Sequence, residues 1–154
     1  MKSQLAFLMT TLLFLSLLGH GFADTAAVSV SGIQLGMTIE EADRILRERG
    51  YQASGAKEGW TSYLPQELNI HNLTGPQIKF DTNSTVSAIR SEYPVEIAIG
   101  SRLVTNYDEA VSGFGLPKSE LRDPNGETHA WFDEGVELVF GSPDRGILKA
   151  TLVR

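Results

Sequence analysis

The sequence has 154 residues, of which 42% are hydrophobic and 21% are charged, and it contains no cysteine. This apolar content is too high for an intrinsically disordered chain, and the lack of cysteine excludes disulfide scaffolds, thiol catalysis and cysteine-based zinc sites. The 13 basic residues are outnumbered by 19 acidic ones, which argues against a nucleic-acid-binding surface and favours a basic partner.

Residues 1–23 have the features of a secretory signal peptide. Lys2 supplies the positive charge, Leu5 to Leu18 are mostly apolar, and Gly21-Phe22-Ala23 resembles a signal-peptidase site, which predicts cleavage before Asp24. The alternative is a membrane anchor, but the apolar stretch is shorter than the roughly 20 residues that span a bilayer. No cysteine follows it to carry a lipid. We therefore expect a periplasmic or secreted protein with no stable membrane anchor, whose mature part is residues 24–154.

The first half of the mature chain predicts one helix followed by strands. Thr38 and Glu41 form a capping box at the start of the helix, and Gly50 ends it. Apolar residues recur at helical spacing between them, namely Ile39, Ala42, Ile45 and Leu46. Segments bounded by turns predict strands over residues 28–30, 60–64, 68–71, 77–81 and 85–90.

The second half restarts this pattern. Ile97-Ala98-Ile99-Gly100 repeats Ile33-Gln34-Leu35-Gly36, and a second helix is predicted after a cap at Thr105, ending at Gly115-Leu116-Pro117. Strands are predicted over residues 127–132, 136–140 and 147–153. The prediction is an α+β fold of two tandem helix-plus-antiparallel-strand units, about 30–93 and 94–154, with the helices packed on one face of a sheet. We expect a single domain; two independent domains are the alternative.

These segments resemble two known groups of proteins. The Ile33-x-Leu-Gly-Met-Thr start, the helix after it and the Phe80-Asp81-x-Asn-x-x-Val hairpin are similar to the SmpA/OmlA outer-membrane assembly lipoproteins and to the β-lactamase-inhibitor-protein-like superfamily. In the second half, Phe114-Gly115-Leu116-Pro117 matches the same pattern. The resemblance implies helix-on-sheet units, an envelope or exported location, and protein binding without chemistry. This chain lacks the lipidated cysteine of the first group and the cysteines of the second.

The sequence offers little to support catalysis or metal binding. His71 and His129 are the histidines of the mature part, and no serine lies in a nucleophile-elbow pattern. In a strand, His129 and Asp133 would be about 13 Å apart, too far for a catalytic hydrogen bond. The segment Asp81–Thr85 resembles the start of a calcium loop, but Val86 stands where that loop has glycine. We predict no catalytic residue, no metal ligand and no cofactor.

Aromatic residues are the better candidates for function, because they are enriched at interface hot spots. The predicted binding residues come from both halves of the chain: Trp60, Tyr63, Tyr93 and Trp131. Trp60 and Tyr63 would lie on opposite faces of a strand, as would Trp131 and Phe132. The hypothesis is that one aromatic residue from each half lines a shared sheet face. The alternative is that all of them belong to the core.

The sequence therefore predicts an exported, non-catalytic protein-binding module, either an inhibitor or an accessory of cell-envelope assembly. Its partner would be another protein of the envelope or the exterior, not a nucleic acid. Two alternatives stay open. The first is a protein that binds a small ligand or peptidoglycan, and the second is a small hydrolase that uses acidic pairs such as Glu40-Glu41 or Asp133-Glu134.

Overall fold

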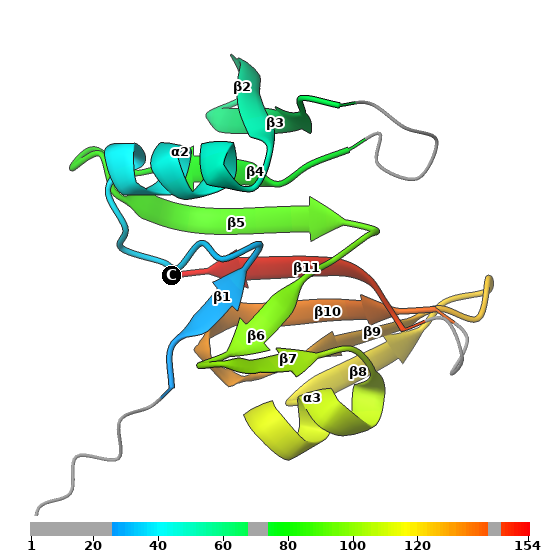
Figure 1. The fold of residues 1–154 in the computed structure, drawn as a ribbon. Coiled ribbons are helices and arrows are strands. Elements are labelled where there is room, and N and C mark those ends of the chain that lie inside the picture. The colour runs from blue at the N-terminus through cyan, green and yellow to red at the C-terminus, as the bar shows by residue number, and fades with distance from the viewer. Residues whose placement is uncertain (1–25, 68–73, 142–145) are drawn as a thin grey trace, which may run out of the picture.

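The structure is a computed structural model that describes residues 26–67, 74–141 and 146–154 (Figure 1). The predicted signal segment and the strand predicted over residues 68–71, with His71, lie outside the described residues. Within the described ranges, no helix is both long enough and apolar enough to cross a membrane.

The described residues form strands for the most part. The strands are β1 (Val28–Val30), β2 (Tyr51–Lys57), β3 (Trp60–Pro65), β4 (Gln77–Phe80), β5 (Val86–Glu92), β6 (Ile97–Ile99), β7 (Arg102–Val104), β8 (Ser119–Arg122), β9 (Thr128–Trp131), β10 (Val136–Phe140) and β11 (Ile147–Val153). The helices are α2 (Ile39–Glu48), α3 (Tyr107–Phe114) and the 3-10 turn η1 (Asp133–Gly135). Eight strands form one antiparallel sheet in the order β2-β3-β4-β5-β11-β10-β9-β8, and β1-β6-β7 form a second sheet.

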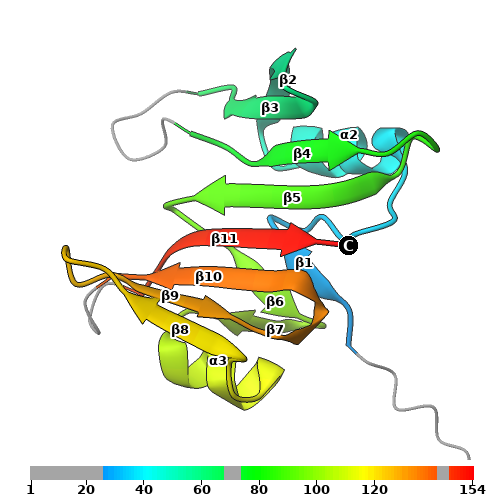
Figure 2. The same cartoon turned by 180° about the vertical axis from the view of Figure 1, so that it is seen from behind.

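The large sheet has one covered face and one open face. In Figure 2 the eight strands lie in front, and the three-stranded sheet lies behind them with α2 and α3 on either side. Alternate residues of the central strands point to the covered face, where Ile89 and Leu138 are fully buried and Leu152 is nearly so. Val30 of β1 and Ile97 of β6 close the core from the opposite side. Their burial is the main apolar contribution to the stability of the fold.

The predicted fold class is wrong. The described chain holds eleven strands and two α-helices, not two helix-plus-strand units with helices packed on one sheet face. A separate sheet is formed by β1, β6 and β7, which were not predicted to pair with one another. The two helices also pack in different places: α3 contacts β7 of this sheet, whereas α2 contacts β2 at the edge of the large sheet. The short strands β7 and β8 and the polar strand β2 have no apolar alternation, so nothing in the sequence marked them as strands.

The start of α2 was predicted correctly from its capping residues, and the start of α3 to within one residue. Thr38 caps α2 in a capping box in which its hydroxyl accepts from the Glu41 amide at 3.2 Å and its own amide donates to the Glu41 carboxylate at 2.9 Å. In α3 the predicted cap is displaced by one residue. Asn106 caps the helix by accepting from the Glu109 amide, while the amide and hydroxyl of Thr105 donate to the Glu109 carboxylate.

Candidate binding surface on the eight-stranded sheet

The pairing register places a row of side chains across the open face. Trp131 of β9 is opposite Glu137 of β10, which is opposite Thr151 of β11. Thr151 is in turn opposite Arg90 of β5, which is opposite Gln77 of β4. Residues directly opposite one another in a sheet share a face, so these five side chains point the same way. Their neighbours on the same strands, Ile89, Leu138 and Leu152, point into the core.

At one end of this row, two side chains hold Arg90 in place, and a third holds one of those two. Its guanidinium carbon lies 4.3 Å from the centre of the Trp60 ring, the geometry of a cation–π contact. Its Nε donates a hydrogen bond to the Gln77 side-chain oxygen. The Gln77 amide nitrogen donates onward to Ser62 Oγ at 3.3 Å. Trp60 therefore lies on the open face and packs against a fixed guanidinium group.

At the other end, Trp131 stacks on His129, with ring centres 6.0 Å apart and ring planes inclined by 22°. The Nδ1 atom of His129 lies 3.9 Å from a carboxylate oxygen of Glu137. His129 thus packs against an aromatic ring and faces Glu137 rather than Asp133, which instead forms an ion pair with Lys118. The two tryptophans occupy the same face of the sheet, one on β3 and the other on β9.

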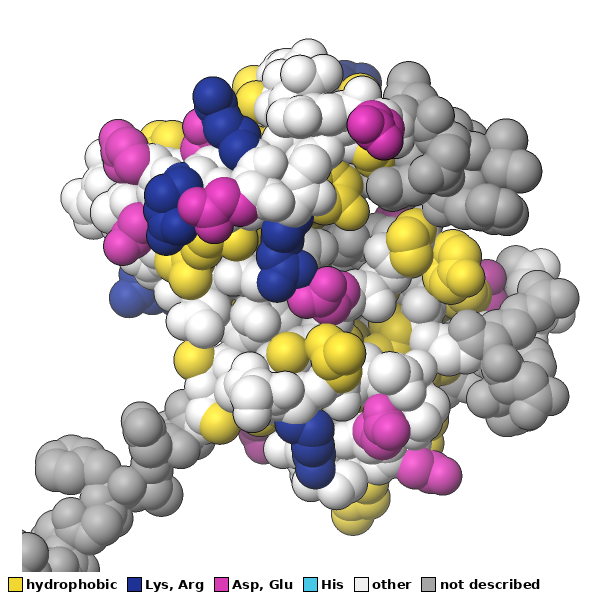
Figure 3. Space-filling model, viewed as in Figure 1, with side chains coloured by type: hydrophobic (Ala, Val, Ile, Leu, Met, Phe, Trp, Pro, Cys, Tyr) yellow, Lys and Arg dark blue, Asp and Glu magenta, His cyan; other side chains and the backbone are white. Residues whose placement is uncertain are grey.

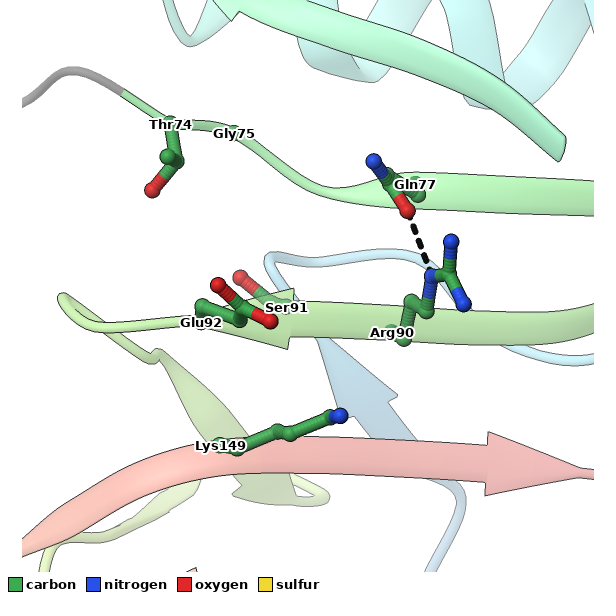
Figure 4. Close-up of a pocket in the computed structure, with 7 residues that line it drawn as sticks. All are labelled: Thr74, Gly75, Gln77, Arg90, Ser91, Glu92 and Lys149. Atoms are coloured by element: carbon green, nitrogen blue, oxygen red, sulfur yellow. Dashed lines mark hydrogen bonds between the residues drawn. The ribbon is translucent and has the colours of Figure 1, made fainter. Parts of the chain in front are cut away.

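A small cavity opens on strands β4, β5 and β11, which lie between the strands of the two tryptophans (Figure 4). It has a volume of about 240 Å³. Its lining comes from the start of β4, the end of β5 and β11, and consists of Thr74, Gly75, Gln77, Arg90, Ser91, Glu92 and Lys149. In Figure 4 the Lys149 side chain extends along β11 toward the side where Arg90 lies. Lys149 and Glu92 are directly opposite in register, yet no ion pair joins them.

Basic side chains of the open face differ in their partners from those of α2. On the side shown in Figure 3, basic and acidic side chains alternate over α2, where Arg44 pairs with Glu48 at 2.9 Å and Arg47 with Asp43 at 2.7 Å. Lys79, Arg90 and Lys149 share the open face, and among the described residues none of them has a carboxylate within ion-pair distance. Pairing leaves the α2 surface nearly neutral, whereas on the open face Lys79, Arg90 and Lys149 outnumber the carboxylates Glu92 and Glu137 by one charge.

The four predicted binding residues lie in three different environments in the structure. Trp60 and Trp131 lie half-buried on the open face. Tyr63 is 2% exposed and belongs to the core, where burial raises the pKa of its hydroxyl, so it is not available to a partner. Tyr93 is 65% exposed just beyond β5, ahead of the cis bond to Pro94. The sequence did not point to Arg90, Gln77 or Lys149, because their relation to Trp60 depends on strand register.

A second cavity lies beside α3 and does not open on this face. It has a volume of about 680 Å³, and its lining includes Tyr107, Glu120 and Phe140. The rings of Tyr107 and Phe140 meet edge to face with centres 5.3 Å apart. The Tyr107 hydroxyl donates to the Glu120 carboxylate, and this hydrogen bond raises the pKa of Tyr107 to about 12.

Of the described residues, Asp123, Glu127 and His129 are the group best placed to hold a metal ion. One ligand atom from each lies within 4.8 Å of the others. Asp123 already has a structural role, because its carboxylate accepts from the backbone amides of Asn125 and Glu127 at 2.9 Å and closes the β8–β9 turn. Asp81 closes the β4–β5 turn in the same way, through the amides of Asn83 and Thr85. We assign no metal to either turn.

Comparisons with known proteins give no family for this chain. No family model matches it, and no curated protein matches it. Among solved structures, it is similar to the crystal structure of a DUF4309 family protein (YjgB) from Bacillus subtilis, with 17% identity over 75% of this chain and 77% of that one, and a TM-score of 0.42. We base no functional assignment on this likeness. The resemblance to the SmpA/OmlA and β-lactamase-inhibitor-like proteins stays a prediction.

Proposed function

We propose that this chain is an exported, non-catalytic protein-binding module that binds another protein through the open face of its eight-stranded sheet. The observation that carries the proposal is the placement of Trp60 and Trp131 on that face, half-buried and separated by the intervening strands. A half-buried tryptophan keeps its orientation and still offers apolar area to a partner, which is why such residues dominate interface energetics.

The distance between the two tryptophans favours a protein over a small ligand. Five inter-strand steps separate β3 from β9. At about 4.8 Å a step they place the two rings roughly 24 Å apart. A standard protein interface covers about 800 Å² on each partner, a patch about 30 Å across. One protein can therefore contact both rings, whereas a small ligand cannot.

The test is capture from an envelope extract with a photo-crosslinker at Thr151, in the middle of the open face. We expect a defined protein to be crosslinked by the parent chain and to be lost when Trp60→Ala and Trp131→Ala are combined. The captured protein is then purified and its affinity for each variant is measured by calorimetry. Circular dichroism on each variant establishes that the fold is retained.

The matched control removes exposed apolar side chains from other surfaces. Leu103 on β7 and Leu116 after α3 are 54% and 81% exposed, and neither belongs to the open face. The variant with Leu103→Ala and Leu116→Ala should bind the captured protein as the parent chain does. Equal affinity of all three chains would contradict the proposed function.

A further inference from the structure

The cavity between Arg90 and Lys149 has the size of a receptor for one side chain. Pockets that hold drug-sized molecules have volumes of about 300–1,000 Å³, and this cavity, at about 240 Å³, is smaller. It opens on the same face as Trp60 and Trp131, on the strands that lie between them. A protein that contacts both tryptophans covers the row from Gln77 to Thr151, and the cavity borders this row at Gln77 and Arg90. The cavity can then receive a single side chain of that protein.

The charges in the cavity determine which kind of side chain it accepts. Arg90 and Lys149 contribute two positive charges and Glu92 one negative charge, so the lining has a net charge of one positive unit. Elsewhere on the same face, Lys79 adds a positive charge next to Trp60 and Glu137 adds a negative charge opposite Trp131, so the sum stays at one positive unit. This local excess is opposite in sign to the net charge of −6 of the whole chain. The overall composition, which favours a basic partner, therefore does not describe this surface.

Arg90 is held in place before any partner arrives. Its Nε donates to Gln77 and its flat face lies against Trp60, and among the described residues its two terminal nitrogens have no hydrogen-bond acceptor. Because the guanidinium is already oriented, a bound carboxylate would not have to order a flexible side chain, and this lowers the entropy lost on binding. Planar donor pairs of arginine match the geometry of a carboxylate.

We infer that the partner inserts an aspartate or glutamate side chain into this cavity, with its carboxylate between Arg90 and Lys149. The inference rests on the proposed function and specifies the chemistry of the partner surface as acidic. One carboxylate neutralises the net charge of the lining. Glu92 would repel a second carboxylate, so the cavity selects a single acidic side chain rather than a dense acidic run.

The test uses two probes that differ in charge and hardly in shape, the α-amides of N-acetylglutamate and N-acetylglutamine, in which the α-carboxyl group is blocked. They are titrated into the isotope-labelled full chain and followed by amide chemical shifts. We expect the glutamate probe, with its single side-chain carboxylate, to shift the amides of Gly75, Gln77, Ser91 and Lys149 in a saturable way, and the glutamine probe, which has no carboxylate, to leave them in place. Raising the salt concentration should weaken the response, because the attraction is between charges partly exposed to solvent.

Three variants make the test specific. The combination of Arg90→Gln and Lys149→Gln should abolish the saturable shifts. Arg44→Gln with Arg102→Gln removes the same charge from other surfaces and should leave them unchanged. Glu92→Gln removes the repulsive carboxylate and should tighten binding of the glutamate probe by about ten-fold, the order expected for one like charge nearby.

Equal shifts with both probes, or full retention in the Arg90/Lys149 variant, would overturn the inference. That result would not affect the proposed function, which depends on loss of the captured protein in the Trp60/Trp131 variant. If the captured protein binds independently of the tryptophans while the glutamate probe still binds between Arg90 and Lys149, the proposed function fails and the carboxylate site stands as a site without an assigned partner.

Discussion

Arg90 lies over the ring of Trp60, with its guanidinium carbon 4.3 Å from the ring centre, and this contact joins the fifth strand of the chain to the third across the strand between them. The pair is part of the proposed binding surface, and it also contributes to the packing of the sheet. Removing this contact should therefore lower the free energy of unfolding.

Replacing Arg90 with methionine keeps most of the aliphatic stem and removes the charge. We expect the free energy of unfolding to fall by about 0.5–1 kcal/mol, the usual strength of a cation–π contact at a partly exposed site. Urea denaturation of Arg90→Met, Trp60→Leu and the double variant completes a double-mutant cycle. A coupling energy near zero would show that the two side chains are neighbours without interacting.

Stability should decrease in acid because three carboxylates, two at helix starts and one in the β4–β5 turn, accept backbone hydrogen bonds. Backbone amides that donate to Glu41, Asp81 and Glu109 hold the pKa of each carboxyl below its ordinary value, with Thr38, Thr85 and Thr105 as the respective donors. A lowered pKa in the folded state means that the contribution to stability is present above the ordinary pKa of 4.5 for glutamate or 3.8 for aspartate. It is lost as the pH falls through the lower folded-state pKa.

We therefore expect the melting temperature to decrease progressively below about pH 4.5. Glu41→Gln, Asp81→Asn and Glu109→Gln should each be less stable than the parent chain at neutral pH and closer to it in strong acid. Glu40→Gln is the control, since Glu40 neighbours Glu41 and does not take part in the capping box. An unchanged pH dependence in the three variants would contradict this account.

Alkaline titration should single out Tyr107. Its hydrogen bond to Glu120 raises its pKa to about 12, so the folded state favours the neutral phenol. The associated stability is intact below the ordinary tyrosine pKa of 10 and is lost as the pH rises from there through 12. In Glu120→Gln, ultraviolet absorbance should show one tyrosine ionising at lower pH than in the parent chain. Tyr107→Phe identifies which tyrosine it is.

Gly135 should tolerate no side chain. It has a φ of +72°, and a methyl group there would lie 2.0 Å from the carbonyl oxygen of Val153, at the end of β11. Gly126 has a similar φ of +85° with open space around it, so Gly126→Ala suffers only backbone strain, about 1–3 kcal/mol. Gly135→Ala should be clearly less stable than Gly126→Ala by chemical denaturation. Equal losses in the two variants would mean that strain alone accounts for both.

The elements predicted from the sequence have a local cap or a regularly spaced buried face. The α2 helix was predicted from Thr38, Glu41 and the apolar face that buries Ala42 and Leu46. The central strands β5, β10 and β11 were predicted from their apolar residues. The edge strands β2 and β8 were missed, because almost all of their side chains are exposed and no period-two pattern marks them.

The candidate surface was only partly predictable, for a related reason. Strand alternation is local, so it could indicate that Trp60 and Tyr63 lie on opposite faces, with Tyr63 now in the core. Which strands lie between Trp60 and Trp131 depends on the pairing of β5 with β11, which are far apart in the chain. Arg90 and Lys149 become neighbours of the cavity only through that pairing, which no local pattern encodes.

The place of β11 in the sheet has a consequence for how the chain is completed. The last of the described strands lies between β5 and β10. Without it, both of those strands have an unpaired edge with exposed backbone donors and acceptors, which are templates for pairing with other chains. A nascent or truncated chain that stops before Ile147 would expose two such edges, so loss of β11 should be more damaging than loss of β1, which lies at the edge of the three-stranded sheet.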